Sequence, residues 1–145
     1  MAFYGSHSLK QYRLFISHAW TYSEGYDRLV RFLDEAPRFN WANHSSPKDR
    51  PAVDSTTVVG KRALRAALKD QIHGTHCVLI VAGMYASHRE WIQAEMDIAD
   101  EYGKPMIGVR PWGQERTPTA VSERVHEMVG WNTSSIVSAI RRLSL

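Results

Sequence analysis

The side chains best placed to do chemistry in this 145-residue chain are a glutamate and a tryptophan. Trp91 and Glu95 are four residues apart in a segment with helical periodicity, so they lie one turn apart on the same face. Ile92, Met96 and Ala99 form the neighbouring apolar stripe. A carboxylate at the margin of such a stripe is partly desolvated and is a candidate catalytic group. The pattern alone favours an ordinary exposed glutamate.

Polar residues that follow two apolar segments are further candidates. Ser17 is the last residue of a strand expected over 12–17, His18 and Trp20 follow that strand, and Tyr85 follows a strand expected over 76–82. Each of these residues has a structural interpretation too: Ser17 can cap a loop, His18 can be a surface histidine, Trp20 can cover the sheet edge and Tyr85 can close the core.

Alternating strand and helix patterns must position these residues. Apolar runs predict strands, and stripes with a spacing of three and four residues predict helices. The expected strands cover 12–17, 39–41, 76–82, 106–109 and 125–130, and the expected helices cover 23–36, 58–72, 88–102 and 134–143. The second of these helices ends at Gly74, and Ser87 with Glu90 forms a capping box that predicts the start of the third.

This alternation predicts an α/β fold with a doubly wound, flavodoxin-like sheet of about five parallel strands and helices on both faces. Ligands of such folds bind outside the carboxyl ends of the strands. That rule selects the loop after Ser17, the long loop over 42–57 and the turn after Val81. We expect residues 1–11 to be a tail and residues 12–145 to be one domain.

Composition excludes several classes of protein. The net charge is +3 and the basic residues are scattered, so we expect no nucleic-acid partner. No apolar stretch is long enough to span a membrane, and the single Cys77 cannot form an internal disulfide, so we expect a cytoplasmic protein. His73 and His76 flank a glycine turn without further ligands, so we expect no metal site. The dinucleotide fingerprint and the P-loop are absent, so any NAD⁺ binding is not of the Rossmann type.

The chain resembles TIR (Toll/interleukin-1 receptor) domains, and in particular the bacterial TIR-like group of Thoeris anti-phage systems. The resemblance lies in the segment 14–20, in Tyr85-Ala86-Ser87 after the apolar run 78–81, in the Trp91 to Glu95 spacing, and in 103–109. The sequence departs from the usual TIR pattern at three places. One extra residue separates Tyr85 from Trp91, Ile92 stands where many TIR domains have cysteine, and the long loop lacks the Pro-Gly pair of signalling adaptors.

The resemblance implies an NAD⁺ glycohydrolase or cyclase with Glu95 as its catalytic residue. NAD⁺ would be the substrate, with no separate cofactor, and the product would be an ADP-ribose derivative, cyclic in the Thoeris group. It also implies self-association through TIR-type contacts and a separate effector protein that senses the product. Ser17, His18, Trp20, Tyr85 and Trp91 would bind the substrate, and Lys48 and Arg50 of the long loop could meet its diphosphate.

Three other functions fit parts of the sequence. A TIR module without enzymatic activity would have no need of Glu95. An enzyme like a nucleoside deoxyribosyltransferase would use a carboxylate on a sugar but would accept nucleosides without NAD⁺. A phosphoacceptor receiver domain needs Asp at strand ends, where this chain has Ser17 and Val81.

Overall fold

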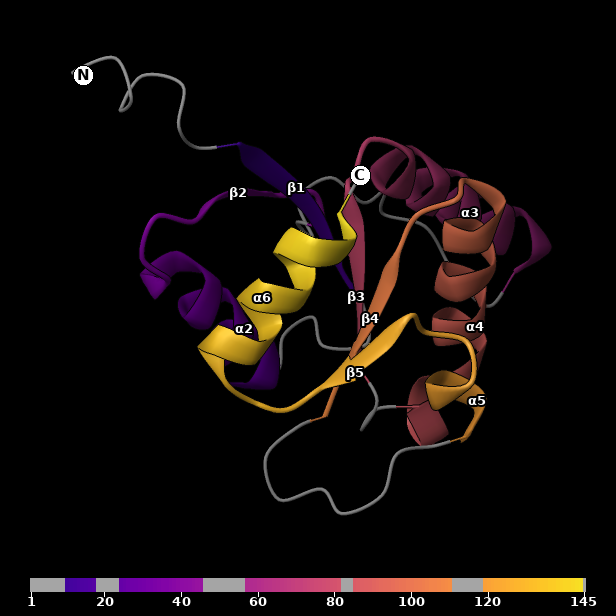
Figure 1. Ribbon diagram of the computed structural model, residues 1–145. Helices are drawn as coiled ribbons and strands as arrows, with labels where there is room; N and C mark the ends of the chain where they lie inside the picture. Colours follow the sequence, from indigo (N-terminus) through magenta and orange to yellow (C-terminus); the bar gives the residue numbers. More distant parts are fainter. Residues whose placement is uncertain (1–9, 18–23, 46–56, 82–84, 111–118, 145) are drawn as a thin grey trace.

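The structure is a computed structural model that describes residues 10–17, 24–45, 57–81, 85–110 and 119–144. These residues form one five-stranded sheet in the order β2-β1-β3-β4-β5, with every neighbouring pair parallel (Figure 1). The strands are β1 (Gln11–Ile16), β2 (Asn40–Asn43), β3 (Cys77–Val81), β4 (Met106–Val109) and β5 (Glu127–Val129). The predicted flavodoxin-like fold is therefore confirmed, because this is the strand order of that fold.

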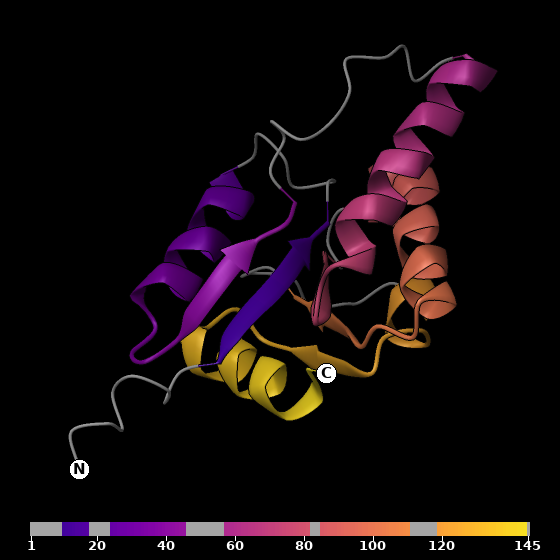
Figure 2. The same cartoon turned by 90° about the horizontal axis from the view of Figure 1, so that it is seen from above.

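Helices cover both faces of the sheet, as the alternating pattern predicts. They are α2 (Glu24–Glu35), α3 (Val58–His73), α4 (Tyr85–Glu101), α5 (Thr119–Ser122) and α6 (Thr133–Leu143). Figures 1 and 2 show α2 and α6 on one face and α3, α4 and α5 on the other. Within the described residues no helix is long and apolar enough to cross a membrane.

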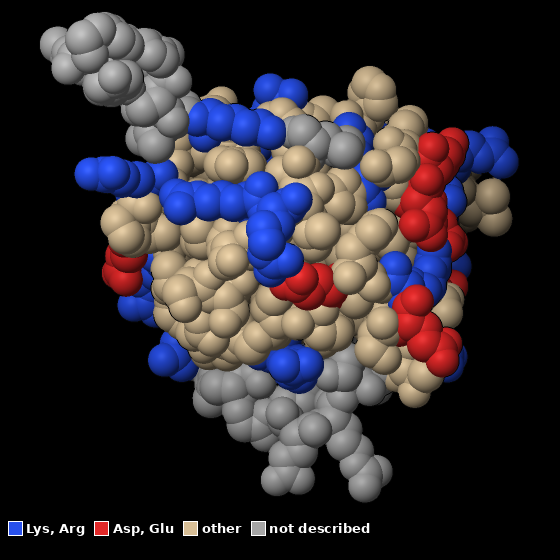
Figure 3. Space-filling model, in the orientation of Figure 1, with Lys and Arg blue, Asp and Glu red and all other residues tan. Residues whose placement is uncertain are grey.

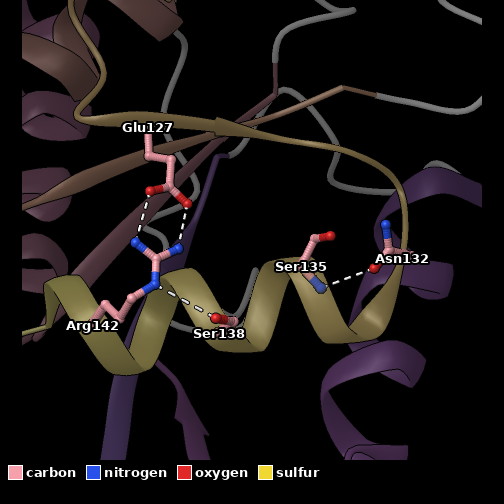
Figure 4. Close-up of polar contacts among 5 residues, drawn as sticks. All are labelled: Glu127, Asn132, Ser135, Ser138 and Arg142. Atoms are coloured by element: carbon pink, nitrogen blue, oxygen red, sulfur yellow. Dashed lines mark hydrogen bonds and ion pairs between the residues drawn. The ribbon is translucent and has the colours of Figure 1, made fainter.

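Two helix starts follow the capping chemistry of their sequences. The side chain of Thr57 accepts a hydrogen bond of 2.9 Å from the N–H of Gly60 and begins α3, where the pattern predicts a helix from residue 58. Asn132 accepts a bond of 2.8 Å from the N–H of Ser135 and begins α6 (Figure 4). In both cases a side-chain oxygen binds an N–H group that lacks a partner inside the helix.

The predicted start of α4 is wrong. The helix begins at Tyr85, three residues before the expected position, so Ser87 lies inside the helix and is not its N-cap. No glycine or proline separates Tyr85 from Ser87, and Ala86 has the highest helix propensity of all residues, so nothing delays the helix until the capping box. The short helix α5 was not predicted, because four residues are too few for a periodic pattern.

The core lies on both faces of the central strands. Leu14, Phe15 and Ile16 of β1 are fully buried, as are Val78 and Ile80 of β3. A strand that is apolar at successive positions fits a parallel sheet covered by helices on both faces. The sequence predicted this environment for the segment 76–82.

Two arginines attach α6 to the rest of the domain. Arg142 donates two hydrogen bonds, of 2.9 and 2.6 Å, to the carboxylate of Glu127 in β5, and its Nε lies 3.5 Å from Ser138 Oγ (Figure 4). The bond from Arg142 lowers the pKa of Glu127. Arg141 donates to the carbonyl oxygen of Arg38 at 2.8 Å, in the turn between α2 and β2.

Basic groups gather where the strands begin. Figure 3 shows Lys and Arg side chains on the surface near the start of β1 and along α6, while Asp and Glu concentrate over α4 and α5. His76, just before β3, accepts a hydrogen bond of 2.9 Å at Nδ1 from the N–H of Arg13. Burial lowers the pKa of His76 from 6.5, and the charges of Arg13, Lys10, Lys104 and His44 lower it further.

The lowered pKa of His76 predicts acid sensitivity. The fold favours the neutral imidazole, so its contribution to stability is present above about pH 6.5 and is lost as the pH falls from there towards the folded-state pKa. We expect His76→Gln to weaken the fall in stability between about pH 7 and 5. Urea denaturation of both proteins across this range measures the effect, with pH 8 as the reference point. Parallel pH profiles would contradict the prediction.

Cys77 predicts a second measurable property. The thiol is fully buried in β3, and burial raises its pKa from the usual 9.0 to about 12. Its thiolate fraction near neutral pH is therefore lower by roughly a thousandfold. We expect a chromogenic disulfide reagent to label Cys77 only when the protein unfolds, with Cys77→Val as the blank. Rapid labelling of the native protein would show that β3 is not protected.

Candidate functional site

The candidate site lies where the connections leaving β1 and β3 diverge to opposite faces of the sheet. β1 leads to α2 on one face, and β3, its neighbour, leads to α4 on the other (Figure 1). This is the topological switch point, where open α/β sheets bind their ligands. The sequence analysis predicted a site after Ser17 and after Val81, and the strand order places the ends of β1 and β3 side by side.

Ser17 is the first residue after β1 and is fully buried. Its N–H donates a hydrogen bond of 2.9 Å to the carbonyl oxygen of Leu79 in β3. Ile16, the residue before it, pairs with Leu79 in the parallel register. The sheet ladder therefore holds the backbone of Ser17 although the strand itself ends at Ile16.

Glu95 lies on the face of α4 that packs against the domain. Its neighbours Ile92, Met96 and Ala99 are fully buried, as the apolar stripe predicts, and Glu95 itself has an exposed fraction of 0%. The sequence predicted a partly desolvated carboxylate, and the structure has a completely buried one. Burial of a carboxylate is costly unless hydrogen bonds compensate it, so such a residue is more informative than an exposed glutamate.

The tertiary structure brings Ser17 and Glu95 into direct contact. The hydroxyl of Ser17 donates a hydrogen bond to Oε1 of Glu95 at 2.6 Å, across 78 positions of sequence. This distance is typical of a hydroxyl bound to a carboxylate. Both residues were candidates from the sequence, but nothing in the sequence indicated that they touch each other.

Trp91 lies one turn before Glu95 and is half-buried. It lines a cavity of about 170 Å³ between α3 and α4, together with Lys61, Arg65, Glu90 and Ala94. Lys61 and Glu90 form a long ion pair of 3.9 Å. The sequence analysis did not single out Lys61 and Arg65, although a helix that follows the long loop must also begin at the carboxyl edge of the sheet.

Several predicted site residues lie outside what the structure describes. His18 and Trp20 fall in the segment 18–23, and Lys48 and Arg50 fall in the segment 46–56. For Tyr85 the structure describes only its place as the first residue of α4. Their predicted contacts with substrate stay predictions.

Metal ligands do not gather in the described part of the chain. Among residues 10–17, 24–45, 57–81, 85–110 and 119–144 no group of three or more His, Cys, Asp or Glu could hold a metal ion. His76 uses Nδ1 to accept the N–H of Arg13, and His126 uses Nδ1 to accept the N–H of Met106, each at 2.9 Å.

The strand order and the buried carboxylate at the switch point define a flavodoxin-like α/β domain with a candidate active site between β1, β3 and α4. Residues 15–116 match the family described as "Thoeris protein ThsB, TIR-like domain". The match covers more than two thirds of the chain and includes Ser17, Trp91 and Glu95. The chain belongs to this family, which confirms the resemblance found in the sequence and supports a role in Thoeris anti-phage defence.

A search of solved structures finds a CMP N-glycosidase from Clostridium botulinum, BcmB, with a TM-score of 0.47 and 13% sequence identity. The alignment covers 89% of this chain and 98% of the other. Similarity at this level has no bearing on the activity of the present chain. No curated protein matches the chain.

Proposed function

We propose that this protein cleaves NAD⁺ at the bond between nicotinamide and ribose, with Glu95 as the catalytic residue, and makes an ADP-ribose-derived signal in Thoeris anti-phage defence. The observation that carries the proposal is the buried Glu95 carboxylate, bound by Ser17 at the carboxyl edge of the sheet. Membership of the ThsB TIR-like family supports the biological setting.

The reaction needs few protein groups. When the C1′–N bond breaks, its electron pair goes to the pyridinium nitrogen, so nicotinamide leaves neutral and needs no proton from an acid. The remaining ribosyl centre resembles an oxocarbenium ion. One carboxylate can stabilise this cation or add to it, as the nucleophile of retaining glycosidases does. Glu95 is well suited because a charge in a water-excluded site acts more strongly than one in water.

The acceptor of the ribosyl centre decides the product. Attack by water gives ADP-ribose and a proton, whereas attack by a nucleophilic atom of the same molecule closes a ring and releases a proton without consuming water. A nucleophilic atom of the same molecule that is held beside the reacting carbon acts at a high effective concentration, which favours a cyclic product over attack by water.

The function of a non-enzymatic interaction module would explain the burial of the Glu95 carboxylate less well. A binding surface uses exposed side chains, and a buried carboxylate contributes nothing to it while carrying a desolvation cost. Burial also implies that the carboxyl edge must rearrange before substrate reaches Glu95. We therefore propose that self-association of the domain assists activation and that a separate effector protein reads the product.

Replacing Glu95 tests the catalytic assignment. We expect Glu95→Gln, which keeps the shape but removes the charge, to reduce nicotinamide release by about 100-fold or more. The assay is chromatography of NAD⁺ reactions at high protein concentration. The matched control is Glu101→Gln on the same helix, where the carboxylate is half-exposed and pairs with Lys69 at 3.8 Å.

Three outcomes would decide against the proposal. Wild-type rates in Glu95→Gln would remove Glu95 from the mechanism. If the purified wild type is inactive, the same proteins are assayed in lysates of phage-infected cells, and inactivity there too would favour the interaction module. Cleavage of nucleosides without NAD⁺ would favour a deoxyribosyltransferase-like activity.

The product provides a separate prediction. We expect a product one water lighter than ADP-ribose, because an internal nucleophile takes the place of water when the ring closes. Mass spectrometry after reaction in water labelled with heavy oxygen measures this, since hydrolysis incorporates the label and cyclisation does not. ADP-ribose carrying the label as the main product would contradict the cyclase assignment but leave NAD⁺ cleavage standing.

A further inference from the structure

The bond between Ser17 and Glu95 joins two fully buried groups. The oxygen–oxygen distance of 2.6 Å lies in the range of a hydroxyl donating to an ionised acceptor. A serine hydroxyl has one proton to donate, and here it is directed at Oε1 of Glu95. Ser17 therefore already uses its donor on the carboxylate, which argues against its being chiefly a contact to ribose or phosphate.

The two partners differ in how firmly the fold holds them. Ser17 has a short side chain on a backbone bonded to Leu79 at 2.9 Å, next to the buried residue Ile16. Glu95 reaches the bond from α4 through a longer side chain with three rotatable bonds. The ladder holds the backbone of Ser17, so its short side chain offers the longer carboxylate side chain a bonding partner at a defined position.

We propose that Ser17 is the positioning residue of this site: its hydroxyl, fixed by the β1–β3 ladder, orients the Glu95 carboxylate and keeps it ionised although it is buried. The expected effect of Ser17 on catalysis rests on the proposed function of Glu95, but its effect on the orientation and ionisation of the carboxylate does not. Burial by itself disfavours the ionised form of a carboxyl group, whereas a hydrogen bond donated to it favours that form. The two effects oppose each other at Glu95.

The proposal separates Ser17 from a substrate-binding residue by its kinetic signature. A residue that binds ribose equally in the ground and transition states changes KM when it is removed. A residue that orients the carboxylate changes kcat and leaves KM nearly constant. It also changes the pH at which the carboxylate becomes active, which simple packing does not do.

Titration of Glu95 tests the physical part without any substrate. The protein is labelled with carbon-13 at the glutamate carboxyl groups, and the Glu95 signal, assigned by its loss in Glu95→Gln, is followed by NMR against pH. We expect the pKa of Glu95 to rise in the order wild type, Ser17→Cys, Ser17→Ala, because a thiol is a weaker donor than a hydroxyl and a methyl group is none. Ser17→Thr keeps the hydroxyl and should stay near the wild type.

Thr75→Val is the matched control. Thr75 is also buried, and its hydroxyl donates at 2.7 Å to the carbonyl oxygen of Ile72, before β3 begins. Removing this hydroxyl deletes a buried hydrogen bond of similar length without touching α4. We expect the titration of Glu95 to be unchanged in this variant.

Kinetics test the catalytic part. We expect Ser17→Ala to lower kcat by about 10- to 100-fold, the loss of one hydrogen bond to a charged group, with KM changed by less than about twofold. The acid limb of the profile of kcat/KM against pH should move to higher pH, and Ser17→Thr should restore both.

The two arms give distinguishable failures. An unchanged Glu95 pKa in Ser17→Ala overturns the positioning role whether or not the protein cleaves NAD⁺. A raised KM with constant kcat overturns it in favour of direct substrate contact. A shifted Glu95 pKa in a protein that cleaves no NAD⁺ supports the positioning of Glu95 and refutes only the proposed function. If Ser17→Ala does not fold, the comparison of Cys with Thr at this position gives the same order.

Discussion

The parallel pairing of β1 with β3 is the constraint on which the site depends. These two strands are parallel neighbours although α2, β2 and α3 lie between them in the chain, so their carboxyl ends meet. The helices that follow them lie on opposite faces of the sheet (Figure 1). The pairing continues one residue past β1 through the bond from Ser17 to Leu79. A slip of one residue in this register would turn Ser17 to the other face of the sheet and separate it from α4.

A buried carboxylate is a cost that a purely structural design would avoid. An apolar side chain at position 95 would continue the stripe of Ile92, Met96 and Ala99 and would need no hydrogen bond. The fold instead supplies a hydroxyl from Ser17, the residue that follows β1. Residues that a fold accommodates at the expense of stability are characteristic of functional sites, and this reasoning connects the packing of α4 with the chemistry proposed for Glu95.

The two edges of the sheet have different roles. At the amino edge, Arg13 and His76 connect β1 with the entry to β3, and basic groups surround them. These contacts hold the strands together, and none of them involves a buried carboxylate like that of Glu95. At the carboxyl edge, Ser17 after β1 and Glu95 of α4 form a hydrogen bond among buried apolar side chains. The stabilising contacts and the candidate site thus lie at opposite ends of the same strands.

The sequence by itself determined the fold class, because hydrophobic period and helix caps are local properties. The apolar run of β3, the Gly74 end of α3 and the stripe of α4 are each visible within a few residues. The sequence also singled out Ser17, Trp91 and Glu95 as candidates. Local pattern misplaced the start of α4, since a capping box permits a helix start without requiring it.

Only the tertiary structure decided what those candidates do to one another. Whether Glu95 is exposed or buried depends on how closely α4 packs on the sheet, and whether Ser17 reaches it depends on strand order and register. The cavity beside Trp91 likewise requires α3 and α4 to lie side by side. These are relations between residues far apart in sequence, and no periodicity within a single element can encode them.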